Sequence, residues 1–145
     1  APAAAMQWHD DFLLGYGPVD HYHQEFVEVM HQLQTADPTQ WDELFETLRA
    51  HLSGHFESEN KMMLDTDFPP RDCHIKEHAA VMQSLVDVQA QMAQGDHSQC
   101  QPLIQALADW FPAHTQHLDS ALVHWVAKHQ LGGKPVIIKR GLSLR

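Results

Sequence analysis

Four stretches with helical periodicity, separated by short breaks, constrain the fold of this chain more than any other feature of its sequence. In each stretch apolar residues recur every three or four positions, which is the spacing of one face of an α-helix. Proline or glycine interrupts the pattern at Pro38, at Pro69-Pro70 and at Gly95. We expect Asp37 to cap the second helix, with Pro38 as its first residue. Because the connections are short, only about two to six residues, sequential helices should pack side by side in opposite directions. We therefore predict an all-α protein, folded as an up-down-up-down antiparallel four-helix bundle.

The length of 145 residues fits a single compact domain and is too short for two ordinary ones. We assign the bundle to residues 18–130, with Pro18 in the first turn of the first helix. Residues 1–17 then form a short N-terminal arm, and residues 131–145 form a basic C-terminal tail. The prediction is one helical domain with an extension at each end.

The fourth helix is predicted to run from about Ser98 or Pro102 to about His129 as one continuous element. A regular helical repeat gives it an inward-facing stripe that consists of Leu103, Leu107, Trp110, Phe111, His114, Leu118, Ala121 and Trp125. Pro112 lies inside this helix, where it removes a backbone hydrogen bond and should distort the chain locally. We therefore expect an irregularity in the fourth helix but no interruption.

Histidines and carboxylates occur in the inward stripes of all four predicted helices. The seven residues are His23 from the first helix, His55 and Glu59 from the second, His74 and His78 from the third, and His114 and Asp119 from the fourth. A buried histidine or carboxylate without a partner costs several kcal/mol, so this many in one core require a common compensation. Imidazole suits iron, copper and zinc, and a carboxylate can bridge two cations. The set therefore predicts a buried centre of two transition metals.

The composition argues against two other classes of partner. A formal net charge of −10 disfavours binding to nucleic acid, whose phosphates attract basic surfaces. The apolar runs are far shorter than the roughly 18 residues that span a bilayer, and the first residues lack the basic and apolar regions of a signal peptide. We expect a soluble, cytoplasmic protein that binds neither nucleic acid nor membranes.

Taken together, the motifs resemble those of the hemerythrin family, especially its bacterial members. The matching stretches are Val19-Asp20-x-x-His23, His55-Phe56-x-x-Glu59, His74-x3-His78 and Trp110-Phe111-x-x-His114-x4-Asp119. The resemblance covers roughly residues 8 to 129, which leaves only the two ends outside it. Tyr22, Phe111 and Thr115 depart from the residues that are usual in the family at these positions.

The resemblance implies a non-haem di-iron centre, bridged by an oxo or hydroxo group, that binds dioxygen reversibly. One iron would be held by His74, His78 and His114 and the other by His23 and His55, with Glu59 and Asp119 bridging the two. The iron with two histidines would keep an open position for dioxygen or a small anion such as azide. Phe111 and Thr115 are predicted to contact the bound dioxygen.

Several functions could use such a centre. We predict an oxygen-binding protein, either a carrier, a store or a sensing domain, and not an enzyme, so no catalytic residue is assigned. The alternatives are a di-iron enzyme that handles nitric oxide or peroxide, and an iron-storage or other metal-binding bundle. Ferritin-like bundles use two Glu-x-x-His motifs, whereas this chain has one, Glu28-x-x-His31. The remaining histidines, including His51, His97 and His129, are expected to be peripheral to the metals.

Overall fold

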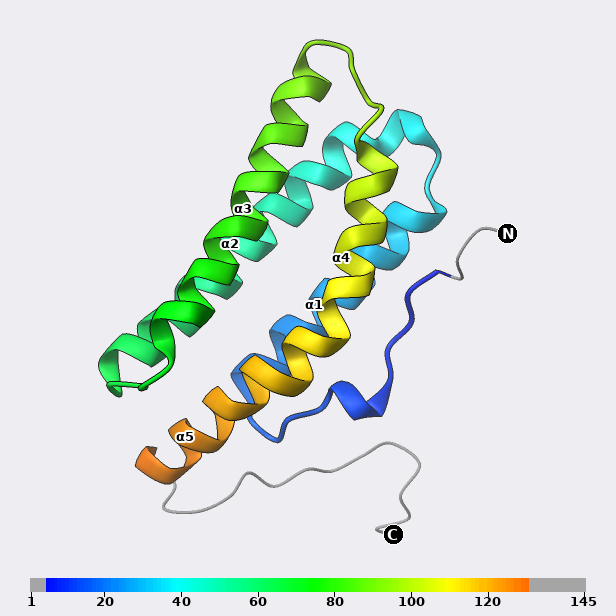
Figure 1. The fold of residues 1–145 in the computed structure, drawn as a ribbon. Helices are drawn as coiled ribbons and strands as arrows, with labels where there is room; N and C mark the ends of the chain where they lie inside the picture. The colour runs from blue at the N-terminus through cyan, green and yellow to red at the C-terminus, as the bar shows by residue number, and fades with distance from the viewer. Residues whose placement is uncertain (1–4, 131–145) are drawn as a thin grey trace, which may run out of the picture.

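The computed structural model describes residues 5–130, and all regular secondary structure in that range is helical (Figure 1). The four long helices are α1 (Gly17–Thr35), α2 (Trp41–Asp65), α3 (Arg71–Ala93) and α4 (Cys100–His114). A π-helical segment, η3 (Thr115–Asp119), joins α4 to α5 (Ser120–Gln130). Two short 3-10 turns are η1 (Asp10–Phe12) and η2 (Pro38–Gln40). The all-α prediction is confirmed, whereas the predicted tail, residues 131–145, lies outside the described residues.

The long helices contact one another in a closed ring. Helix α1 packs against α2 and α4, and α3 packs against the same two helices. Figure 1 shows α4 continuing along its own direction into α5. Each long helix therefore buries one face between two neighbours, which is the arrangement that the amphipathic stripes require. Among the described helices, none has an apolar stretch long enough to cross a membrane.

The beginning of α2 differs from the prediction by three residues. We expected Asp37 to cap this helix directly, with Pro38 as its first residue. In the structure the Asp37 carboxylate accepts a hydrogen bond from the Thr39 amide at 2.9 Å, and this cap opens the 3-10 turn η2. Helix α2 proper begins at Trp41. The α-helix begins later than expected because a short 3-10 turn precedes its first turn, as is frequent at the ends of α-helices.

The N-terminal arm is tied to the start of α1 by one buried carboxylate. Asp20 accepts hydrogen bonds from the amides of Leu14 and Gly15 at 2.7 and 3.1 Å. Gly15 has a φ of 85°, a conformation that residues with a Cβ rarely adopt. The turn brings Phe12 back against the bundle, where its side chain is buried in the main apolar cluster. The arm therefore adds to the core.

The π turn η3 is the largest departure from the predicted helices. Such a turn contains one residue more than an α-turn, so every later residue is displaced by one position relative to a regular helix. The predicted Leu118, Ala121 and Trp125 are accordingly not buried. The buried residues beyond His114 are Thr115, Asp119, Leu122, Val123, Val126 and Ala127. The expected irregularity of the fourth helix thus lies beyond Pro112, as an added residue that changes which side chains face the core.

The apolar core is divided into clusters on either side of a polar centre. The largest cluster includes Phe26, Met30, Leu48, Leu52 and Leu85. A smaller one near the other end of the helices consists of Met63, Phe68, Leu122 and Val126. On α2, Glu59 lies between Phe56 of the first cluster and Met63 of the second, and beyond α3 both His114 and Asp119 lie between Phe111 and Leu122. The fold therefore surrounds the polar residues with apolar side chains.

Candidate metal centre

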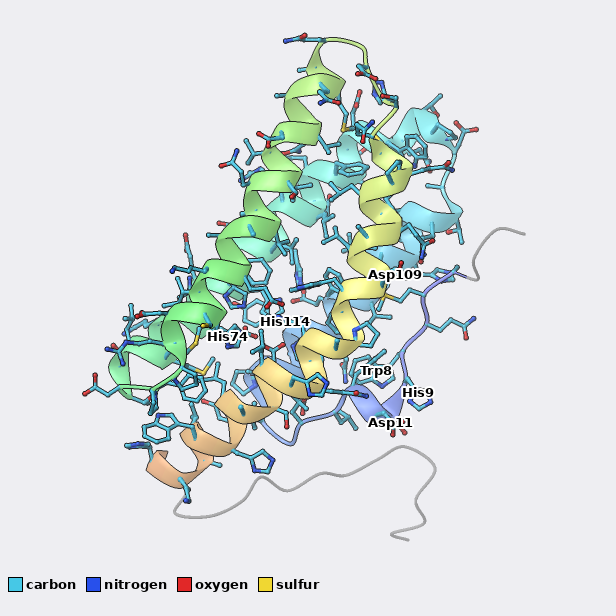
Figure 2. All side chains as sticks on the ribbon, in the orientation of Figure 1. Trp8, His9, Asp11, His74, Asp109 and His114 are labelled. Carbon is cyan, nitrogen blue, oxygen red and sulfur yellow. The ribbon has the colours of Figure 1, made fainter. Side chains whose placement is uncertain are left out.

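The seven predicted residues converge in the interior of the bundle, and each is at most 3% exposed. Their potential ligand atoms form two overlapping groups. Within each group, all the atoms lie within 4.8 Å of one another. The first group consists of Glu59, His74, His78, His114 and Asp119, and the second of His23, His55, Glu59 and Asp119. Figure 2 shows His74 and His114 between α3 and α4, and their ring centroids are 4.9 Å apart. The two carboxylates belong to both groups.

The carboxylate of Asp119 directs one oxygen to each group. Its Oδ2 lies 2.9 Å from Nε2 of His23, which belongs to the two-histidine group. Its Oδ1 lies 3.0 Å from Nε2 of His74 and 3.1 Å from Nε2 of His114, which belong to the three-histidine group. A single side chain therefore spans both halves of the centre.

Glu59 has the same arrangement from the opposite side of the bundle. Its Oε2 lies 2.6 Å from Nε2 of His55. Its Oε1 lies 3.2 Å from Nε2 of His78 and 3.6 Å from Nε2 of His74. Both carboxylates are thus placed to offer one oxygen to each of two cations, which is how carboxylates bridge paired metals.

The spacing of His114 and Asp119 depends on the π turn. These residues are five positions apart, and in a regular α-helix of 3.6 residues per turn they would face different directions. The extra residue of η3 completes the turn, so that both side chains enter the centre. The geometry of the candidate centre therefore requires this irregularity. π turns often occur at functional sites.

Several ligand atoms face one another at 3.0–3.2 Å but make no hydrogen bond within the described protein. The buried atoms without a hydrogen bond include Oε1 of Glu59, Oδ1 of Asp119 and Nε2 of His74, His78 and His114. Leaving a buried polar atom unsatisfied costs roughly 1–3 kcal/mol. Bound cations would satisfy these atoms together, and a set of imidazoles and carboxylates suits iron. The residues present therefore fit a pair of iron ions.

In the metal-free protein, burial opposes protons on His23 and His74, but the buried carboxylates favour them by raising the pKa of each imidazole. Burial raises the pKa of Glu59, but the adjacent His55, His74 and His78 outweigh it and hold that pKa well below its ordinary value. Burial lowers the pKa of His74, yet the carboxylates of Asp119 and Glu59 raise it to about 9. Metal ions would replace these protons, so metal binding should release protons and weaken at acid pH.

Phe111 and Thr115, the two residues predicted to contact a bound ligand, are both buried. The Phe111 ring is 1% exposed, and its centroid lies 5.2 Å from that of His23 and 5.0 Å from that of Phe12 in the arm. Thr115 is fully buried, and its hydroxyl has no hydrogen-bond partner in residues 5–130. The Phe111 ring is therefore near the two-histidine group, where a ligand was predicted.

Two polar residues near the centre were missed by the sequence analysis. Nδ1 of His114 lies 2.7 Å from Oε1 of Glu77, and Nδ1 of His78 lies 2.8 Å from Oδ1 of Asn60. Burial raises the pKa of Glu77, but His114 and Trp110 outweigh it and lower that pKa. Glu77 directly precedes the ligand candidate His78 in the sequence, and that adjacency was the available signal.

His51 is less peripheral than the sequence analysis expected. Its side chain is 7% exposed, its Nε2 has no partner in the described residues, and its ring contacts Tyr22 and His55. Burial, together with the positive charge of His55 and His23, lowers the pKa of His51 to about 4. The ring is packed against the centre, although neither group of potential ligand atoms includes it.

His51 should therefore make the metal-free protein sensitive to acid. Below its ordinary pKa of 6.5 the unfolded chain binds this proton and the folded chain does not, so stability should fall between about pH 6.5 and 4. At about 1.4 kcal/mol per pKa unit, the loss from this residue has an upper limit of about 3 kcal/mol. Urea unfolding of wild type and His51→Gln at pH 7 and pH 4.5 measures it. An equal loss in both proteins would contradict the assignment.

Comparisons with known proteins agree with this geometry. Residues 14–126 match the family described as hemerythrin HHE cation binding domain. A bacteriohemerythrin of Ralstonia nicotianae (strain ATCC BAA-1114 / GMI1000) is 29% identical over 123 residues, which cover 85% of this chain and 90% of that relative. The range matched by the family, residues 14–126, includes all seven residues of the candidate centre.

Proposed function

The chain belongs to the hemerythrin family, and from that premise we propose that it binds dioxygen reversibly at a non-haem di-iron centre. The observation that carries the proposal is the division of both buried carboxylates between the two histidine groups. A site for one metal would not need two carboxylates that each face both ways. The relative's name, bacteriohemerythrin, agrees with this function.

The proposed ligands divide unequally between the two metals. His74, His78 and His114 would hold one iron, His23 and His55 would hold the other, and Glu59 and Asp119 would bridge them. When bound, the two irons supply one electron each, which is the chemistry that reversible dioxygen binding requires. The iron with two histidines would have fewer protein ligands, so it would be the one with space for a small molecule. The proposal is of a binding protein and not of an enzyme.

The surrounding residues keep this space small and apolar. The Phe111 ring on α4 contacts His23 of the two-histidine group, and Phe12 of the arm packs against the Phe111 ring. The buried Thr115, four residues after Phe111, would line the same space. Exclusion of water would prevent solvent from donating a proton to the bound ligand, so that the ligand is released unchanged. The Thr115 hydroxyl is the polar group of this wall that could donate a hydrogen bond to such a ligand.

We also propose the up-down-up-down arrangement and the three-part division of the chain. The short connections, residues 36–40, 66–70 and 94–99, support the arrangement, as does the path of the chain through α1, α2, α3 and α4 in Figure 1. The bundle would occupy residues 18–130. Contacts of Phe12 with Phe111 and of the Met6 amide with Gln34 support the arm as a separate element that packs on it.

The reversibility of ligand binding tests the proposed function. The purified protein should contain two irons per chain, and its reduced form should develop a visible absorption band in air. That band should disappear under vacuum and return on re-exposure, because a carrier releases its ligand unchanged. An irreversible change on the first exposure would instead favour a di-iron enzyme, and fewer than two irons at saturation would refute the assignment of the seven residues.

A further inference from the structure

The histidines of the centre differ in what their outer nitrogens contact. All five direct Nε2 toward Glu59 or Asp119, which leaves Nδ1 on the outer side of each ring. Nδ1 of His23, His55 and His74 has no hydrogen-bond partner in the described part of the chain. Nδ1 of His114 and of His78 each has a side-chain acceptor. Both supported rings belong to the three-histidine group.

One oxygen of Glu77 supports His114. Its Oε1 accepts a hydrogen bond from Nδ1 of His114 and another from Nε1 of Trp110, both at 2.7 Å. The indole of Trp110 also stacks on the His114 ring, with centroids 4.3 Å apart. The Glu77 carboxylate and the stacked Trp110 indole fix the orientation of the His114 imidazole. The carboxylate also keeps the proton of the ring on Nδ1. The lone pair of Nε2 is therefore left facing the centre.

Asn60 supports His78 in a parallel way but without charge. Its Oδ1 accepts a hydrogen bond from Nδ1 of His78 at 2.8 Å. The ring of Phe56 stacks on His78, with centroids 4.0 Å apart and an angle of 8° between the planes. Each of these two histidines thus has an aromatic ring on one face and an acceptor at its outer nitrogen. The acceptor is a carboxylate for His114 and an amide for His78.

We propose that Glu77 is a positioning residue that strengthens His114 as a metal ligand, so that the three-histidine half of the centre takes up its metal first. A carboxylate that accepts the Nδ1 proton makes the opposite nitrogen more basic, and losing such a partner typically weakens metal binding 10–100-fold. The two-histidine half has no equivalent acceptor among the described residues. The inference rests on the proposed function, because it concerns the same two metals.

Glu77→Gln separates charge from geometry in testing this proposal. The amide oxygen can accept both hydrogen bonds, so the ring stays in place while the negative charge is lost. Glu46→Gln is the matched control, since Glu46 is an exposed residue of α2 that pairs with Arg49. The double variant Glu77→Gln/Asn60→Asp returns a carboxylate to the same half, at His78 instead of His114, and should rescue binding.

The experiment is a cobalt(II) titration of the metal-free, full-length protein, followed by the visible absorption of bound cobalt. Wild type and Glu46→Gln should bind two ions in distinguishable steps. Glu77→Gln should weaken the first step about 10-fold and leave the second nearly unchanged, and the double variant should recover most of the loss. Equal titrations of wild type and Glu77→Gln, or equal weakening of both steps, would overturn the role of Glu77 alone. A wild type that binds fewer than two ions would overturn the proposed function instead.

Discussion

Removing the two carboxylates that face both histidine groups, by Glu59→Ala together with Asp119→Ala, should reduce the iron content from two ions per chain to nearly none. Each carboxylate faces both histidine groups, so its loss removes a ligand from both metals and leaves their mutual repulsion less compensated. Metal analysis of protein reconstituted with iron(II) under anaerobic conditions measures the change. Full occupancy in the double variant would show that these residues do not bind metal.

Two further variants serve as controls for this prediction, one for loss of folding and one for general damage to the protein. Glu59→Gln with Asp119→Asn keeps the side-chain volumes, so it should lose metal while retaining the helical circular dichroism of wild type. His97→Ala serves as the surface control, because His97 pairs with Asp42 at a partly exposed site and belongs to neither group of potential ligands. It should keep both irons and shift stability by no more than about 0.5 kcal/mol. Loss of iron in His97→Ala would show that metal content reports general damage.

Phe111→Ala should produce the second large effect, a loss of about 3–5 kcal/mol in the free energy of unfolding. The Phe111 ring is 1% exposed and packs against Phe12, Phe26 and His23, so its removal leaves a cavity beside the two-histidine group. The cavity should also open a path for small anions. Stopped-flow binding of azide to the oxidised, iron-loaded protein should therefore be faster than in wild type.

The conservative variant Phe111→Leu separates access from packing. It retains most of the apolar volume and should cost less than about 1.5 kcal/mol. If the ring controls access, azide should bind to Phe111→Leu at an intermediate rate. If Phe111→Ala is merely less stable and binds azide at the wild-type rate, the ring is ordinary core packing and has no part in ligand entry.

Much of this architecture follows from the sequence because its determinants are local. Apolar periodicity and the proline and glycine breaks were sufficient for the all-α prediction, and the polar residues in the stripes identified the set that the structure brings together. The downstream stripe of the fourth helix was wrong because a regular repeat was applied across Thr115–Asp119. The five-residue spacing of His114 and Asp119 was a sign of the π turn, because both could face inward only with an extra residue.

Other features depend on contacts between helices and could not be found from one helix at a time. Glu77 lies on α3, and the two groups that donate to it, on Trp110 and His114, lie on α4. A glutamate next to a ligand candidate is usually exposed, and only the packing of the two helices shows which outer nitrogen it reaches. The burial of His51 is a similar case, because it depends on Tyr22 from α1.

The π turn also has a consequence for how this site can change in evolution. In the coding sequence it corresponds to one codon more than a regular helix needs. An inserted codon ordinarily rotates everything downstream by about 100°, but here the added residue is taken up within η3 and α5 keeps its packing on Met63 and Phe68. The exposed residues Gln116 and His117 lie in this turn. Loss of this one codon would therefore preserve the core that α5 completes, although it would change the spacing of the two candidate ligands.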